Sequence, residues 1–384
     1  MLGTRLSSWI WYWLRRPALL VASGIWLAYI CIGALIIGVD PYDLYPWGKD
    51  ITVASRHQPF DAARLIRLAA KDKNADTILI GSSPTTMYTP DDIKKAFPGT
   101  NKPWNISYHG ATAYDREQTL DELVEYSDAK HFIITIDYFY ADPRIITRNF
   151  PDYMYDDNLT NDLRMINLGS LKASYLTLRY GTPYRDISAM LTKEDGYIAS
   201  FRNRFQNKNN MAILRDNIEN YRGKIAAVGR VNCNEFPMLE PFFSQITALS
   251  AKGARVDLII PAYSPAIYYD WIAAPIQRRL VGRTMLNDQL LMRRCVVEKA
   301  SQINQVSVSS IDLDEDIVGD LANFRDSGHL DHKDNLMAIL SAPEDPDRRI
   351  TRNNLENYIK KVRNTVLNYQ FHNSAFPKIR GRKH

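Results

Sequence analysis

The sequence is poor in cysteine and has no cluster of residues spaced to hold a metal. Only three of its 384 residues are cysteine, and none lies at a zinc or iron–sulfur spacing from another ligand. Asp331 and His332 are adjacent but have no third ligand nearby. We therefore expect no metal and no other cofactor. Cys31 falls in an apolar segment, so Cys233 and Cys295 either form a disulfide or remain buried thiols, and we favour the thiols.

Charge is absent from one long stretch near the N-terminus. Residues Pro17 to Val39 contain no charged side chain. At about 1.5 Å per residue they reach roughly 34 Å, enough to cross a hydrocarbon core of about 30 Å. Three arginines and no acidic residue precede them, whereas Asp40 and Asp43 follow at once. The positive-inside rule then places the N-terminus in the cytoplasm and everything after Val39 on the other side of a membrane.

A cleaved signal peptide is the alternative interpretation of this stretch. The apolar region of a signal peptide usually has about 7–15 residues and ends at small side chains. The stretch here is longer, and Val39-Asp40-Pro41-Tyr42 is a poor cleavage site. We therefore favour an uncleaved, single-pass anchor.

The residues after the anchor carry little net charge. All 43 acidic residues follow it, with all but three of the 48 basic residues, so this part has a net charge of only +2. Such a balance gives no reason to expect nucleic-acid binding. We expect a cytoplasmic segment at 1–16, the span at 17–39, a linker at 40–60, one α/β domain at 61–372 and a basic tail at 373–384.

Short apolar runs alternate with helical patterns along the domain. Runs typical of buried strands occur at 77–80, 105–108, 131–137, 255–260 and 306–311, and helices are predicted at 61–71, 90–97, 114–126, 237–252, 286–302 and 353–369. Strands joined by helices indicate a parallel sheet covered on both faces. We therefore expect a flavodoxin-like, three-layer α/β sandwich with a central parallel sheet of about five strands. Residues 142–235 interrupt this rhythm and predict a mainly helical insertion, which either shapes a groove or packs on the core.

Polar motifs follow the first and last predicted strands, and sites in such sheets form at the carboxyl ends of strands. Gly81-Ser82-Ser83-Pro84 places serine hydroxyls near the free N–H groups of a helix start, which can stabilise an oxyanion. A Ser-Pro pair is also a common helix cap. In the loop Asp326-Ser327-Gly328-His329, the carboxylate can hold the histidine in the tautomer that a base needs. A surface turn with an incidental histidine is the alternative. We expect the fold to bring the two motifs together.

With these motifs the chain resembles the SGNH (GDSL-like) hydrolase superfamily. The match consists of Gly81 and Ser83 after the first strand, Asn105 and Gly110 after the second, and Asp326 and His329 near the end. The resemblance implies Ser83 as nucleophile, His329 as base and Asp326 as its orienting partner. It also implies that the N–H groups of Ser83 and Gly110 form the oxyanion hole. Ser82 replaces the usual Asp of the superfamily, which leaves a one-residue ambiguity in the nucleophile.

The third conserved block of the superfamily is not matched. That block reads Gly-x-Asn-Asp, and its Asn completes the oxyanion hole, whereas this chain has Asp137-Tyr138-Phe139-Tyr140 after the third strand. Losing one such donor typically costs about 2.7–4 kcal/mol of transition-state stabilisation. Either Tyr138, Tyr140 or another donor substitutes, or the catalytic power is low.

The anchored layout resembles a branch of the superfamily found in bacterial envelope and exopolysaccharide systems. This resemblance implies a periplasmic domain on the inner membrane, beside a multi-spanning acyltransferase or polysaccharide synthase and export subunits. We expect a serine acyltransferase or esterase acting on O-acyl groups, acetyl above all, of an exported glycan. The alternative is a catalytically degenerate scaffold or glycan-binding subunit, because a fold alone does not determine function.

Overall fold

The computed structural model describes residues 3–41, 59–108, 110–141, 166–181, 208–222, 232–273, 285–326, 328–330 and 333–370. The predicted basic tail and nearly all of the predicted linker lie outside these residues, as do Asp331 and His332. Of the predicted insertion, the described part includes the helices α5 (Leu168–Tyr180) and α8 (Lys208–Tyr221).

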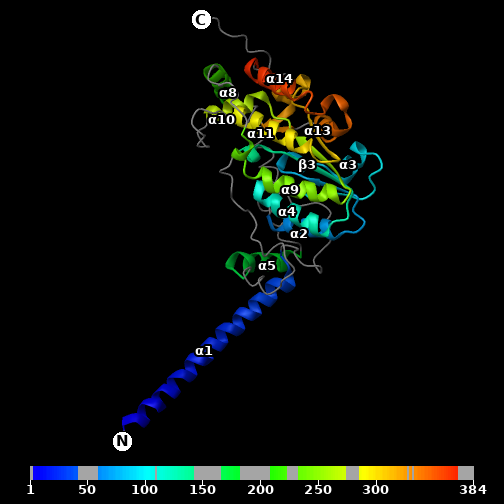
Figure 1. Cartoon of the computed structure of the whole chain (residues 1–384). Coiled ribbons are helices and arrows are strands. Elements are labelled where there is room, and N and C mark those ends of the chain that lie inside the picture. The colour runs from blue at the N-terminus through cyan, green and yellow to red at the C-terminus, as the bar shows by residue number, and fades with distance from the viewer. Residues whose placement is uncertain are drawn as a thin grey trace.

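The apolar stretch lies in a long helix, α1 (Gly3–Val39), which begins well before the predicted span. Figure 1 shows α1 projecting away from the α/β part of the chain. Within the described residues, its segment Pro17–Val39 is the one helix long and apolar enough to cross a membrane, with a mean hydropathy of 2.3. The helix ends because Asp40 adopts a left-handed conformation with φ of 47° and is followed by Pro41, which cannot continue a helix.

The centre of the fold is a five-stranded parallel sheet, as predicted. Its strands are β1 (Thr77–Ile80), β2 (Pro103–Asn105), β3 (His131–Thr135), β4 (Arg255–Ile260) and β5 (Val306–Ser310). They lie in the order β2-β1-β3-β4-β5, which is the flavodoxin-like order. The strands at the centre of the sheet are buried beyond the first residue of β3 and of β4 and beyond the first two residues of β5, since helices cover both faces.

The second strand lies earlier in the chain than predicted: β2 spans Pro103–Asn105 and shares only Asn105 with the predicted run 105–108. Regular pairing with β1 stops at Asn105, although the N–H of Ile106 still donates to the Leu79 carbonyl over 2.9 Å. Asn105 Oδ1 accepts the N–H of Ser107 at 3.0 Å. The N–H of Tyr108 lies 3.4 Å from the Gly81 carbonyl oxygen, so the segment after β2 stays beside the segment after β1 although the regular pairing has ended.

The helices cover the sheet in two layers. The connections from β2 to β3 to β4 to β5 all run in one direction across the sheet, so right-handed crossovers place their helices on one face. Figure 1 shows α9, α4 and α2, the helix that precedes β1, side by side; α2 contacts α4, α4 contacts α9, and α9 contacts α11. The opposite crossover contains α3, which packs against α13 on the other face. The bounds are α2 (Pro59–Lys71), α3 (Pro90–Ala96), α4 (Ala113–Tyr126), α9 (Leu239–Ala251), α10 (Pro265–Ala273), α11 (Met285–Ala300), α12 (Glu315–Val318), α13 (Lys333–Leu340) and α14 (Leu355–Leu367).

Two helix boundaries follow the expected capping chemistry. The Thr89 hydroxyl accepts the N–H of Asp92 at the start of α3, and the Asp92 carboxylate accepts the Thr89 N–H in return. This reciprocal pair is a capping box, with Pro90 at the first helical position. Helix α4 begins with the same arrangement between Thr112 and Asp115.

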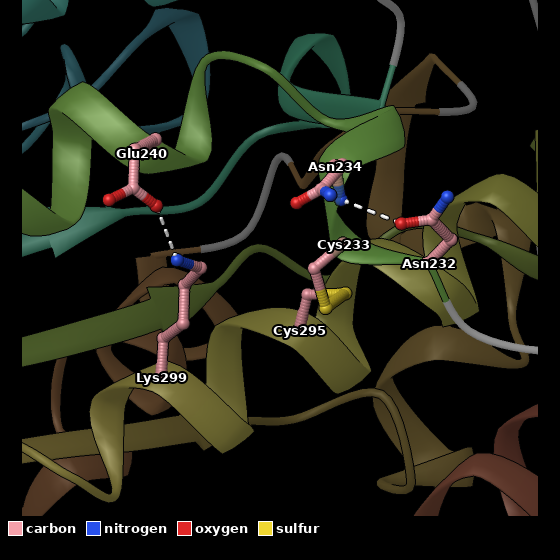
Figure 2. Close-up of a disulfide and its surroundings, with 6 residues drawn as sticks. All are labelled: Asn232, Cys233, Asn234, Glu240, Cys295 and Lys299. Atoms are coloured by element: carbon pink, nitrogen blue, oxygen red, sulfur yellow. Dashed lines mark hydrogen bonds and ion pairs between the residues drawn. A yellow bond between two sulfur atoms is a disulfide. The ribbon is translucent and has the colours of Figure 1, made fainter.

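Cys233 and Cys295 form a disulfide, so the favoured prediction of two unpaired thiols is wrong. The bond joins the short 3-10 helix η6 (Cys233–Glu235) to α11, with Cα atoms 5.6 Å apart, and it closes a loop of 62 residues. Figure 2 shows the two side chains meeting, and an ion pair of 2.6 Å between Glu240 of α9 and Lys299 of α11 near them. Spacing in the sequence carries no sign of this pairing, because the packing of η6 on α11 brings the two cysteines together.

Candidate functional site

Ser83 and His329 meet at the carboxyl end of the sheet. The hydroxyl Oγ of Ser83 lies 2.7 Å from Nε2 of His329, and both side chains are half-buried. Ser83 begins the 3-10 helix η1 (Ser83–Thr85), three residues after β1 ends. His329 begins the short strand β7 (His329–Leu330). A distance of this size is a hydrogen bond, and it allows the imidazole to receive the serine proton.

The backbone around Ser83 leaves its N–H group available. Ser82, in an extended conformation, precedes η1, and its carbonyl oxygen accepts the N–H of Thr85 at 3.0 Å. Pro84 has no N–H to offer. Within the described part of the chain, the N–H of Ser83 has no acceptor. This is the ordinary condition of the first turn of a helix, and such groups bind anions.

The turn that carries Ser83 is compact because Gly81 has no side chain. A Cβ atom at Gly81 would lie 1.8 Å from Oγ1 of Thr85. That hydroxyl sits 3.0 Å from the Ser82 carbonyl oxygen and 2.9 Å from Oγ of Ser107. The glycine therefore lets the turn fold back against the segment that follows β2.

Asn105, the last residue of the neighbouring strand β2, holds this turn in place through side-chain hydrogen bonds. Its Nδ2 donates to the carbonyl oxygens of Thr85, at 2.9 Å, and of Tyr88, at 2.8 Å, while its Oδ1 accepts from Ser107. Both N–H bonds of the amide are thus used. Asn105 holds the backbone of η1 in place and has no donor left for an oxyanion.

The histidine comes from a small hairpin rather than from the loop that the sequence predicts. Strand β6 (Phe324–Asp326) pairs with β7 in an antiparallel ladder, in which the Cα atoms of Asp326 and His329 are partners. The side chain of Asp326 lies outside what the structure describes. Neighbouring strands do not bring Ser83 and His329 together. Ser83 follows β1 and His329 comes after β5, and two strands, β3 and β4, separate β1 from β5. Instead, the chain after β5 returns across the sheet end, and β7 packs on η1.

A further contact holds the two sides of the site together. The hydroxyl of Tyr88, three residues after η1, donates to the carbonyl oxygen of Leu336 in α13 at 2.5 Å. Burial, and after it the charge of Asp92, raises the pKa of the Tyr88 hydroxyl well above its usual range. This phenol therefore stays protonated and keeps its role as a donor.

The remaining predicted site residues differ in how far they are exposed. Gly110 is exposed and left-handed, with φ of 71°, in the turn before α4. Tyr138 begins the 3-10 helix η2 (Tyr138–Ala141), and its half-buried ring contacts that of Tyr263. Tyr140 is only 2 % exposed, with its ring against Phe242 of α9. The structure thus places Tyr140 in the core.

Two buried ion pairs at the same end of the sheet escaped the sequence analysis. Asp137, two residues after β3, pairs with Arg116 of α4, and both side chains are 1 % exposed. Asp312, two residues after β5, pairs with Arg293 of α11, which is fully buried. The phenol of Tyr358 donates to the same Asp312 oxygen at 2.8 Å. Both carboxylates are thus buried and paired with an arginine, in contrast to the half-buried Ser83 and His329.

A third polar cluster lies toward the amino end of the sheet. Asp257 of β4 is 1 % exposed and lies 2.8 Å from His131 Nε2, 2.6 Å from Ser307 Oγ and 2.6 Å from Arg255. Burial raises the pKa of the Asp257 carboxyl, but the hydrogen bonds of His131 and Ser307 and the charge of Arg255 more than offset that effect. The resulting pKa is below its usual value. Within the described residues, no group of three or more His, Cys, Asp or Glu side chains is arranged to hold a metal ion.

Comparisons with known proteins add little to this geometry. No protein-family model matches the chain, and no curated protein matches it. Among solved structures, the chain is similar to a protein from Streptococcus pneumonia provisionally named as a platelet activating factor. The two share 12% sequence identity over 78% of this chain and 91% of the other, with a TM-score of 0.34. A TM-score this low establishes no common fold.

Proposed function

We propose that this chain is a membrane-anchored, extracytoplasmic serine acyltransferase or esterase of the SGNH type. Its substrates would be O-acyl groups, acetyl above all, of an exported cell-envelope polysaccharide. The observation that carries the proposal is the hydrogen bond between Ser83 and His329, which come from positions 246 residues apart. A serine hydroxyl is a weak nucleophile until a base within hydrogen-bond reach takes its proton.

The proposed reaction proceeds in two steps. Oγ of Ser83 attacks the carbonyl carbon of an acyl ester while Nε2 of His329 accepts the hydroxyl proton, and the free N–H of Ser83 donates to the oxyanion. The ester C–O bond then breaks, and the leaving oxygen takes the proton from His329. A sugar hydroxyl or a water, deprotonated by His329, attacks the acyl-serine and restores Ser83. Asp326 is assigned to orienting His329, and the N–H of Gly110 to the second oxyanion donor.

Two features support the proposed location. The segment Pro17–Val39 exposes large apolar side chains such as Leu20 and Trp26, which are 74% and 65% exposed. A lipid environment would bury them. The disulfide between Cys233 and Cys295 fits an oxidising compartment, such as the bacterial periplasm. An inner-membrane position would place the site beside a multi-spanning acyltransferase or polysaccharide export subunits, which would supply the acyl group or the glycan.

Replacing each of the two adjacent serines tests the proposal directly. The full chain in detergent is assayed with a chromogenic acetyl ester, and with an acyl donor plus a glycan. Ser83→Ala and His329→Ala should each lower kcat by about 10⁶-fold, the loss that removing the nucleophile or the base causes in a serine triad. Ser82→Ala is the matched control, because Ser82 is buried and contributes no side-chain cap to η1. Equal activity in wild type, Ser83→Ala and His329→Ala would refute the proposal.

A catalytically degenerate scaffold or glycan-binding subunit is the second candidate. Two observations favour it: the amide of Asn105 is fully used within the fold, and Tyr140 packs in the core. Neither side chain is then placed to complete an oxyanion hole. Glycan binding that persists unchanged in Ser83→Ala, with no turnover by the wild-type chain, would support this second candidate.

A further inference from the structure

Helix α5 lies against the end of α1. It begins at Asn167, whose side chain accepts the N–H of Ser170 at 2.9 Å, and it ends at the left-handed Gly181. Figure 1 shows α5 beside the end of α1 that leads to the α/β part of the chain, and the two helices are in contact. Helix α5 lies within residues 142–235, which the sequence predicts to be a mainly helical insertion.

The buried positions of the two helices are small or apolar. On α5 they are Ser170, Ala173 and Ser174, each at most 2 % exposed. On the last turns of α1 they are Gly33 and Ile36. Small side chains allow two helix backbones to approach closely. The contact between α1 and α5 is therefore a packed interface. This packing fixes the position of α5 along the axis of α1.

The opposite face of α5 is apolar and exposed. Leu168 is 86 % exposed, Leu178 60 % and Tyr175 57 %. Lys172 and Arg179 share the exposed surface, and the helix contains no acidic residue. Apolar and aromatic side chains beside basic ones are the composition of helices that lie in a membrane interface.

The level of α5 along α1 matches that interface. Gly33 and Ile36 precede the last residue of the apolar segment, Val39, by six and three positions. At about 1.5 Å per residue, the contact lies roughly 5–9 Å inside the end of the span. Interfacial helices bury their apolar face to a depth of about 5–10 Å. Given a membrane-spanning α1, the exposed face of α5 therefore sits where acyl chains meet headgroups.

We propose that α5 is an interfacial helix that binds the lipid surface on the side of the membrane where the α/β domain lies. Leu168, Tyr175 and Leu178 enter the boundary of the acyl chains, and Lys172 and Arg179 contact anionic phospholipid headgroups. This proposal rests on the membrane anchor of the proposed function and not on its chemistry. Together with α1, the helix gives the domain two attachments, which restrict its rotation and tilt above the bilayer.

Site-directed fluorescence on the full chain tests the proposal. The chain carries one environment-sensitive label at position 175 (Tyr175→Cys with Cys31→Ser), in vesicles of phosphatidylcholine and phosphatidylglycerol. Ile213→Cys in the same background is the matched control, since Ile213 is 58 % exposed on α8. A label on the native Cys31, which is exposed on α1, reports on the anchor. Lipid-borne quenchers should quench labels at 175 and 31, and aqueous iodide should quench only the label at 213.

The outcomes separate this proposal from the one on which it rests. Iodide quenching at 175 with lipid quenching at 31 overturns the interfacial helix and leaves the anchor intact. Iodide quenching at 31 overturns the anchor and the interfacial helix together. A label at 175 that is open to iodide in vesicles but protected in native membranes indicates a protein partner on α5, which also overturns the lipid proposal.

The basic residues provide a second measurement. Each Lys or Arg near an anionic surface contributes about 1 kcal/mol. Replacing both Lys172 and Arg179 with Gln should therefore lower the ratio of lipid-bound to water-exposed α5 about 30-fold in anionic vesicles. In pure phosphatidylcholine the same substitutions should change little. An equal effect in both kinds of vesicle would overturn the assignment of headgroup contacts.

Discussion

Removing the disulfide between Cys233 and Cys295 should destabilise the α/β domain by about 4 kcal/mol. The bond closes a loop of 62 residues, and the chain-entropy model gives about 4 kcal/mol for a loop of that length. Domains are stable by only about 5–15 kcal/mol, so the loss is a large share of the total. For a domain of this size it corresponds to a fall in Tm on the order of 10 °C.

The assay is urea unfolding of the full chain in detergent, with and without the double substitution Cys233→Ala and Cys295→Ala. Alanine is preferred to serine because Cys295 is fully buried, and a hydroxyl there would add a desolvation cost. Cys31→Ser is the matched control, since Cys31 is free and exposed on α1. Reduction of the wild-type chain should reproduce the effect of the double variant. A change within about 0.5 kcal/mol, the range of a neutral surface substitution, would refute the reasoning.

Three further substitutions test other contacts, all by urea unfolding. Asn105→Leu leaves two carbonyl oxygens beside η1 without a donor and should lower the free energy of unfolding by about 1–3 kcal/mol for each. An unchanged urea midpoint would show that Asn105 does not hold η1 in place. Arg116→Met leaves Asp137 charged and buried and should cost about 3–5 kcal/mol, whereas Lys73→Ala, which removes an exposed ion pair, should leave the midpoint unchanged. Asp257→Asn should destabilise the domain at pH 7, and its difference from wild type should shrink as the pH falls below about 4. The folded pKa of Asp257 is below its unfolded value of about 3.9, so its contribution is complete above that pH and is lost as the pH falls through the folded value. A difference that stays constant with pH would rule out this titration.

The sheet was predictable because its strands are buried on both faces. Thr77–Ile80 is apolar after its first residue, and Arg255–Ile260 ends in three apolar residues; the two runs stop at Gly81 and Pro261, which mark their ends. The helices showed equally clear periods; in α14, Leu355, Ile359 and Val362 are buried as the spacing predicts. Patterns of this kind are local, so a sequence displays them without reference to the rest of the fold.

Contacts between distant segments were much harder to predict from the sequence. Strands β6 and β7 have three and two residues, too few for any period to appear. Arg116 resembles an ordinary exposed arginine on an amphipathic helix, and only the packing of α4 on the sheet encloses it with Asp137. The family resemblance suggested Ser83 and His329 as partners, but sheet order alone would have kept them apart.

The long separation of Ser83 from His329 in the sequence determines when, during synthesis of the chain, the two side chains can meet. The serine leaves the ribosome 246 residues before the histidine, an interval of roughly 12–50 s at ordinary rates of synthesis. Until the β6–β7 hairpin has formed, the hydroxyl lacks the imidazole of His329 as its partner. The Ser83–His329 pair therefore forms only when nearly all of the α/β domain has been made, so a partly synthesised chain cannot contain the pair.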